Sequence, residues 1–399
     1  MKRALLVTAI IIAVVSAIII AAISLLNHHE ASASATATDN SGTPTRPEFQ
    51  RSESNDPPST RVYHTLLPSE PGDEWSEPIV SQTKKGDRPY LGDFHPADPI
   101  TLTIPALPPH KLVRISFDLF LFRSWDGSSP YYGYAKWDLT ADDQSLIHTT
   151  FNNCGFFGGG NDKQAFPDTW PSRWHLAWTL ATEHETLGMP QSWGTFTADA
   201  SCVYHMDLTF PHSGPNVVFQ FLSDMKGGDK RKLYGLTNVV VSTLPELASY
   251  SPGQIASMWN DLGSSDPAVF WKAQWDLAQA GDAATNFIAD HVSDNIDMTP
   301  EAAAKLFDQL QDNDREGSPV FDRLSMQGRT LSDLYDKTLA SNSSHTQQIA
   351  ALKALAVRYP ATATELRNTR AKHLLGIIHT PAALALADKI VDQPLGPEK

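Results

Sequence analysis

Hydrophobic and polar residues change their spacing twice along the chain, and each change marks a different kind of segment. Residues 4–26 carry no charge, which predicts one continuous apolar helix. Residues 75–244 hold short alternating runs separated by Gly, Pro, Asn and Asp, a pattern typical of β-strands. After residue 245, hydrophobic residues recur every three or four positions, which predicts helices.

The strand region predicts an antiparallel β-sandwich. Its longest run, residues 112–122, predicts a half-buried strand. The alternate hydrophobic positions, which would share one face, are Val113, Ile115, Phe117, Leu119 and Leu121. Further strands are expected at residues 100–104, 204–210, 217–222 and 236–241. Many short strands with long connections favour two packed sheets, and a closed barrel is the alternative.

Eight helices are expected in the C-terminal region, at residues 254–262, 267–280, 283–292, 300–311, 330–339, 345–358, 364–378 and 381–391. Asp266, Thr299 and Thr380 each precede a proline, the sequence of a helix N-cap followed by the first helical residue. Pairs of short amphipathic helices at intervals of about forty residues predict a HEAT-like α-solenoid of two or three repeats.

The N-terminal apolar segment is long enough to cross a membrane, because about 23 helical residues span roughly 35 Å. Lys2 and Arg3 precede it, so the positive-inside rule predicts a single-pass membrane protein with a cytoplasmic N-terminus and an extracytoplasmic bulk. The alternative is a signal peptide, cleaved at the Ala-Ser-Ala sequences of residues 31–35 to give a secreted protein. The length of the segment favours the uncleaved anchor.

Four regions follow from these patterns. Residues 1–30 are expected to form a transmembrane signal-anchor, and residues 31–70 a disordered linker rich in Ala, Ser, Thr and Pro. Residues 71–247 form the predicted β-sandwich domain, and residues 248–399 the predicted helical repeat domain. The predicted fold class is therefore multidomain, with an N-terminal transmembrane helix, an antiparallel β-sandwich and a C-terminal all-α HEAT-like repeat.

Composition narrows the function. The chain has 31 Lys and Arg against 45 Asp and Glu, a formal net charge of −14 that disfavours nucleic acid as a partner. It lacks the His-Glu-x-x-His, Gly-x-Ser-x-Gly and phosphate-loop motifs, so no motif indicates an enzyme. Cys154 and Cys202 are predicted to form one disulfide in an oxidising compartment, and two buried free thiols are the alternative.

Three aspartates near strand ends are candidate metal ligands. Asp118, Asp126 and Asp168 supply the carboxylate oxygens that calcium prefers. They form no contiguous calcium loop, and ordinary turn chemistry explains the same residues. Calcium is thus the one cofactor the sequence suggests, without a complete motif.

Aromatic residues gather between the predicted strands and suggest a binding platform. The candidates are Trp170, Trp174, Tyr131 and Tyr132. Aromatic rings give flat, partly polar faces, and loops on a rigid sandwich are where binding residues gather. Large aromatic side chains also bury their area in cores, so packing is the alternative interpretation.

Two stretches resemble domains of predicted surface proteins of planctomycete-type bacteria. Residues 257–288, with a Trp-x-x-Leu helix and a Gly-Asp-Ala turn, resemble the start of a degenerate HEAT-like module. Further along the chain, Pro319 interrupts a helix that is continuous in that module. Residues 234–239 resemble the Trp-Gly-Leu-Asp-Asn-Val ending of jelly-roll, galactose-binding-like sandwiches, with Thr237 in place of the usual Asp. The resemblance implies extracellular adhesion or glycan binding.

The sequence therefore predicts a non-catalytic, membrane-anchored extracytoplasmic protein. Its β-sandwich would contact a glycan or envelope ligand, and its helical repeat would contact a protein partner. One alternative is an envelope polysaccharide hydrolase, which needs two carboxylates about 5–10 Å apart. The candidates for such a pair are Asp126, Asp168, Glu183 and Glu185. The other alternative is a purely structural protein.

Overall fold

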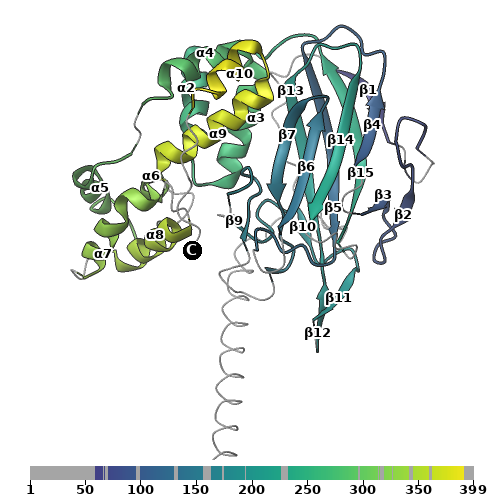
Figure 1. The fold of residues 1–399 in the computed structure, drawn as a ribbon. Helices are drawn as coiled ribbons and strands as arrows, with labels where there is room; N and C mark the ends of the chain where they lie inside the picture. The colour runs from purple at the N-terminus through teal and green to yellow at the C-terminus, as the bar shows by residue number, and fades with distance from the viewer. Residues whose placement is uncertain are drawn as a thin grey trace, which may run out of the picture. The chain divides into compact units, whose positions relative to one another are not determined.

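The computed structural model describes residues 59–390, apart from gaps at 66, 68–70, 96–98, 130–133, 156–162, 173–174, 194, 226–231, 295–296, 313, 315–318, 326, 341–344 and 359–361. Its β-strands form two main antiparallel sheets (Figure 1). The larger has the order β10-β13-β5-β15-β3-β2, and β1 also pairs with β15. The smaller has the order β4-β14-β6-β7. These sheets confirm the predicted antiparallel sandwich strands.

The strand bounds are as follows. The larger sheet contains β1 (Thr60–His64), β2 (Val80–Gln82), β3 (Pro89–Phe94), β5 (Leu112–Phe122), β10 (Glu183–His184), β13 (Ser201–Pro211) and β15 (Leu233–Leu244). The smaller contains β4 (Ile100–Ile104), β6 (Ala135–Ala141), β7 (Gln144–Thr150) and β14 (Val217–Met225). Two further pairs join β8 (Lys163–Gln164) to β9 (His175–Leu176) and β11 (Pro190–Trp193) to β12 (Phe196–Asp199).

Strand β5 lies at the centre of the larger sheet, between β13 and β15. The predicted inward residues are all fully buried in the main core: Val113, Ile115, Phe117, Leu119 and Leu121. The prediction that the other face is exposed is wrong in the second half of the strand. There Phe120 and Phe122 form a smaller core with Tyr90 and Leu187, because strand β3 and the connection after β10 cover this face.

The helices agree closely with the predicted segments. They are α2 (Pro252–Asp261), α3 (Pro267–Ala280), α4 (Asp282–His291), α5 (Pro300–Phe307), α6 (Pro319–Ser325), α7 (Ser332–Ala340), α8 (Thr346–Arg358), α9 (Ala363–Ile378) and α10 (Pro381–Ala387), with a 3-10 turn at Gly328–Leu331. Asp266, Thr299 and Thr380 cap α3, α5 and α10 as predicted. Helix α6, which begins at Pro319, was missed.

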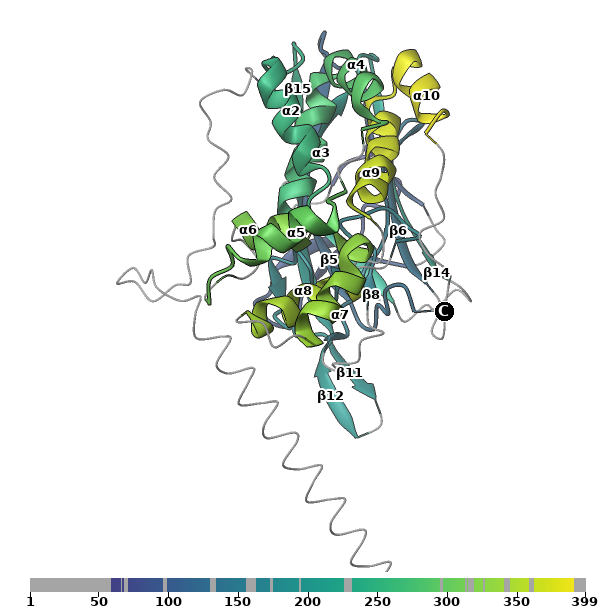
Figure 2. The ribbon, with the colours of Figure 1, turned by 90° about the vertical axis from the view of Figure 1, so that its left-hand side faces the viewer.

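The predicted HEAT-like solenoid is wrong. In a solenoid each repeat contacts only its sequence neighbours, yet α9 packs against α3, and α10 packs against α4 (Figure 2). Helices α5–α8 build a separate hydrophobic cluster. Helices α3 and α9 also contact β13, and α9 contacts β7. One hydrophobic core therefore runs from the sandwich into α2–α4, α9 and α10.

The membrane part of the prediction is also corrected. In the described part of the chain, no helix combines the length and apolar character that a membrane span requires. Residues 4–26, on which the transmembrane helix, the membrane partner and the extracytoplasmic location rested, lie outside the described residues, as does most of the linker. What the structure shows is a mixed α and β fold with mostly antiparallel sheets. Without a solenoid, the protein partner predicted for its concave face also loses its basis.

Candidate functional site

The predicted aromatic platform is described at one of its four residues. Trp170 is half-buried, and its ring centroid lies 4.3 Å from that of Tyr134. Trp174, Tyr131 and Tyr132 lie outside the described residues. The structure thus places one predicted aromatic residue in a partly exposed ring pair on the sandwich loops.

Internal contacts fix the loop that carries Trp170, between β8 and β9. The backbone N–H of Trp170 donates to the carbonyl of His148 on β7 at 2.8 Å. The hydroxyl of Thr149 donates to the carbonyl of Asp168 at 2.8 Å. Phe166 packs edge-on against Trp271 of α3, with ring centroids 5.0 Å apart. The ring pair therefore lies on a loop held by both the smaller sheet and a helix.

The three aspartates predicted as calcium ligands have separate partners. Asp118 accepts hydrogen bonds from Asn238 and pairs with His205, each at 2.7 Å. The carboxylate of Asp126 pairs with the buried Lys232 at 2.6 Å. Among the described residues, no group of three or more His, Cys, Asp or Glu side chains is placed to hold a metal ion. No calcium site is proposed.

The two cysteines are buried free thiols, so the predicted disulfide is not formed in this structure. Burial raises the pKa of the Cys202 thiol well above its ordinary value, and the nearby Cys154 raises it further. A thiol with a raised pKa is a weak nucleophile, so Cys202 is inert here.

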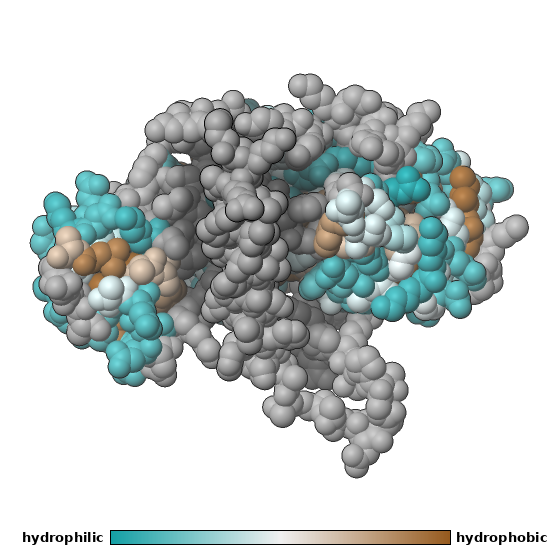
Figure 3. Space-filling model, turned by 90° about the horizontal axis from the view of Figure 1, so that it is seen from below, coloured by the Kyte–Doolittle hydropathy of each residue, from teal (hydrophilic) through white to brown (hydrophobic). Residues whose placement is uncertain are grey.

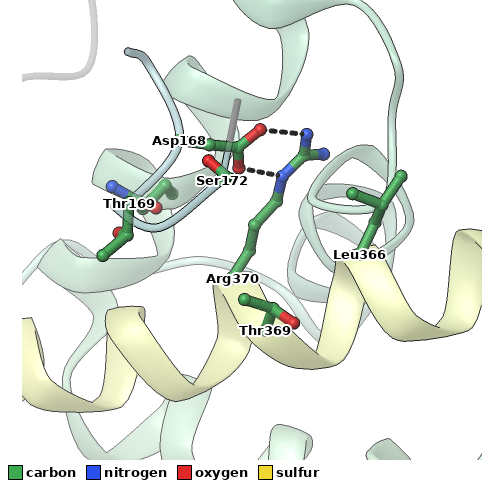
Figure 4. A pocket seen from close by; sticks show the side chains of 7 residues that line it. Asp168, Thr169, Ser172, Leu366, Thr369 and Arg370 are labelled. Atoms are coloured by element: carbon green, nitrogen blue, oxygen red, sulfur yellow. Dashed lines mark hydrogen bonds and ion pairs between the residues drawn. The ribbon is translucent and has the colours of Figure 1, made fainter. Parts of the chain in front are cut away.

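Asp168 instead belongs to a buried ion pair that joins the sandwich to the helices (Figure 4). Its carboxylate accepts from Nε of Arg370 at 2.7 Å and from a terminal guanidinium nitrogen at 3.0 Å. His175 of β9 lies 2.9 Å from the same carboxylate. Asp168 and Arg370 are 202 positions apart in the sequence, so no local pattern could reveal this pair.

Nearly all hydrogen-bond donors of the Arg370 side chain have acceptors. Its remaining terminal nitrogen donates to the carbonyls of Leu262 and Ser264, at 2.9 and 2.6 Å. The guanidinium also stacks over Phe270 of α3, 3.4 Å from the ring centroid. Four of its five N–H donors thus have acceptors within the protein, which offsets the removal of the charge from water.

The ion pair determines how Asp168 titrates. Burial alone would raise the pKa of the carboxyl, but the charge of Arg370 and hydrogen bonds from His175 and Arg370 hold it well below its ordinary range. Asp168 and Arg370 therefore both stay charged in the folded protein above about pH 4. The cavity beside it, lined by Ser172, Gln274 and others, has about 10 Å³, roughly enough for one water molecule. This junction is a structural contact and has no room for an organic ligand.

A second set of contacts joins α9 to β7. Gln144 donates to the carbonyl of Ile377 at 3.1 Å, and His373 hydrogen-bonds to the backbone of Leu146. Burial, together with the nearby His148, lowers the pKa of His373 from 6.5 to about 4, although the bond to Leu146 and the charge of Asp168 oppose the shift. The α9–β7 interface is thus built for a neutral imidazole.

Comparison with known proteins adds little. No protein-family model and no characterised sequence matches the chain. Latent PorU from Porphyromonas gingivalis is 12% identical over 42% of this chain and 12% of its own, with a TM-score of 0.25. A Paenibacillus sp. cycloisomaltooligosaccharide glucanotransferase complexed with cycloisomaltoheptaose is 10% identical over 59% of this chain and 28% of its own, with a TM-score of 0.20. The chain spans less than a third of either protein, and neither similarity supports an argument.

Replacing Asp168 by Ala should destabilise the protein strongly, because it leaves the buried guanidinium of Arg370 without its counter-charge. The expected loss is about 3–5 kcal/mol in the free energy of unfolding, measured by denaturant titration. The matched control is Asp207→Ala, which breaks a two-pronged pair with Arg114 that is about a third exposed. That change should cost about 1 kcal/mol or less. Equal losses would refute the role given to the buried pair.

Acid should weaken the α9–β7 interface through His373. The unfolded chain takes up a proton near pH 6.5 that the folded chain resists until about pH 4, so the free energy of unfolding falls as pH drops through this window. Allowing for the partial exposure of the ring, the loss is about 2 kcal/mol. His373→Gln should remove the contribution of this imidazole to the pH dependence. The free energy of unfolding should then differ less between pH 7 and 4.5 than it does in the wild type. His64→Gln, at an exposed position on β1, should leave the full difference.

Proposed function

We propose that this chain is a non-catalytic binding protein, and that the loops at one end of its sandwich bind a glycan through Trp170 and Tyr134. The observation that carries the proposal is their ring pair, 4.3 Å between centroids, with both rings partly exposed. Each ring offers an apolar face beside a polar N–H or O–H group, a combination suited to the alternating C–H and hydroxyl groups of a sugar.

The setting of the ring pair supports this function. Trp170 follows Asp168 by two positions, so the buried ion pair with Arg370 limits the movement of its loop. A loop that is already ordered loses little entropy when ligand binds. Tyr134 immediately precedes β6, whose backbone is fixed by pairing with β7 and β14. The two rings thus lie on supports that do not need to rearrange.

The contacts of the candidate carboxylates favour binding over the hydrolase alternative. Each of the four lies within 4 Å of a basic side chain: Asp126 of Lys232, Asp168 of Arg370, Glu183 of Arg88, and Glu185 of His184. A glycosidase needs a general acid with a raised pKa, whereas Arg370 and His175 hold the pKa of Asp168 well below its usual range. Asp168 therefore lacks the raised pKa that the general acid of such a pair needs.

Trp170→Ala and Tyr134→Ala should each weaken glycan retention about fivefold, because an aromatic contact of this kind is worth about 1 kcal/mol. The full chain would be tested by pull-down on insoluble cellulose, chitin and peptidoglycan. Trp170→Phe should keep most of the retention.

The matched control is Phe287→Ala on α4, which removes a half-buried ring stacked on His291 at 3.9 Å. Near-ultraviolet circular dichroism would establish that each variant is folded. The proposal is disproved if none of the three polymers retains the wild type. It is also disproved if the Trp170, Tyr134 and Phe287 variants are retained equally.

A further inference from the structure

A polar depression lies on the sandwich, separate from the junction with the helices. It has a volume of about 130 Å³ and is lined by Lys84 and Arg123. The other lining residues are Met189 and the first three residues of β11, Pro190, Gln191 and Ser192. Three segments meet there: the turn after β2, the end of β5 and the start of the β11–β12 hairpin. Seen from below, the coloured part of the sandwich surface is mainly hydrophilic (Figure 3).

Both charged groups that line the depression are cations, and no carboxylate lines it. Within the described part of the chain, neither Lys84 nor Arg123 forms an ion pair.

The walls of the depression are fixed by contacts that do not involve its cations. Asp199 accepts hydrogen bonds from the backbone N–H groups of Gly188 and Met189, at 2.7 and 3.0 Å. Gly188 has φ +70° and lies so close to Lys85 that a Cβ would come within 2.8 Å of its side chain. The N–H of Lys85 donates to the carbonyl of Leu187 at 3.2 Å. These contacts hold the β2–β3 turn against the start of β11.

Arg123 ends β5 in the left-handed conformation, with φ +66°. A residue with a side chain adopts this conformation at a cost of roughly 1 kcal/mol, so the surrounding structure must maintain it. Arg123 is half-buried as a residue and lines the depression. A guanidinium gives two-pronged hydrogen bonds to oxyanions, which the ammonium group of a lysine does not.

The geometry points to an oxyanion-binding site, and we propose that Lys84 and Arg123 bind a sulfate, phosphate or carboxylate group carried by an acidic polysaccharide. The volume is far above the roughly 10–15 Å³ needed for one water and well below the roughly 300–1,000 Å³ of pockets that enclose a whole ligand. It therefore accepts one charged group of a larger molecule. This inference adds a charge to the ligand of the proposed function, but it rests on residues outside the Trp170–Tyr134 pair.

Dextran sulfate is the probe, with unmodified dextran and inorganic sulfate beside it, titrated into the full chain by calorimetry at low and moderate salt. Arg123→Gln and Lys84→Gln should each weaken binding of dextran sulfate at least tenfold, while Arg123→Lys should recover part of the loss. The matched control is Lys305→Gln, which removes an exposed lysine on α5 and should leave the affinity unchanged.

Each other outcome overturns the inference in a definite way. Equal weakening by Lys305→Gln would mean a general charge effect, and unchanged binding in Arg123→Gln would exclude the site. If inorganic sulfate binds with the same affinity per sulfate group as dextran sulfate, the ligand of the site is a free anion and not a polysaccharide. Trp170→Ala leaves Lys84 and Arg123 in place. If this variant still binds dextran sulfate, the oxyanion site stands even where glycan binding by the Trp170–Tyr134 pair has failed.

Discussion

The buried pair of Arg370 and Asp168 is the interaction on which the arrangement of sandwich and helices depends. A guanidinium removed from water is tolerated only where acceptors meet its donors. Here the acceptors come from a sandwich loop and from the α2–α3 connection, at Leu262 and Ser264. Three segments distant in sequence must reach one point before the charge is satisfied. An open solenoid, in which α9 would follow α8 away from the sandwich, would leave this charge unpaired.

Hydrophobic burial provides most of the driving force but does not select this arrangement by itself, because it is non-directional. The apolar residues Leu374 and Ile378 of α9 are compatible with many apolar partners. The directional contacts of Arg370, His373 and Gln144 determine which strand α9 meets and in which position. The pair of Arg370 with Asp168 also holds the loop that carries Trp170, two positions further along the chain.

The parts of the structure that were predictable from sequence are those governed by local patterns. Alternation identified β5, and the caps at Asp266, Thr299 and Thr380 identified three helix starts, because strand faces and caps depend on residues only a few positions apart. The Asp168–Arg370 pair was unpredictable, since its partners are distant in sequence. Asp118 and Asp126 were interpreted as calcium ligands for the same reason: the sequence shows their oxygens but not Asn238, His205 or Lys232, which occupy them.

Net charge does not describe the local field at one point of the surface. A value of −14 describes the average field around the chain, while a bound group responds to the charges within a Debye length, about 8–10 Å. Lys84 and Arg123 are brought together only by the meeting of two strand ends with the start of β11.

The depression beside Lys84 and Arg123, of about 130 Å³, is too small to enclose a whole ligand, so its contact with a single charged group would be weak. A polymer presents the same group many times and raises its effective concentration at the surface. Shallow sites on rigid loops are therefore better suited to a repeating polysaccharide than to a free monosaccharide.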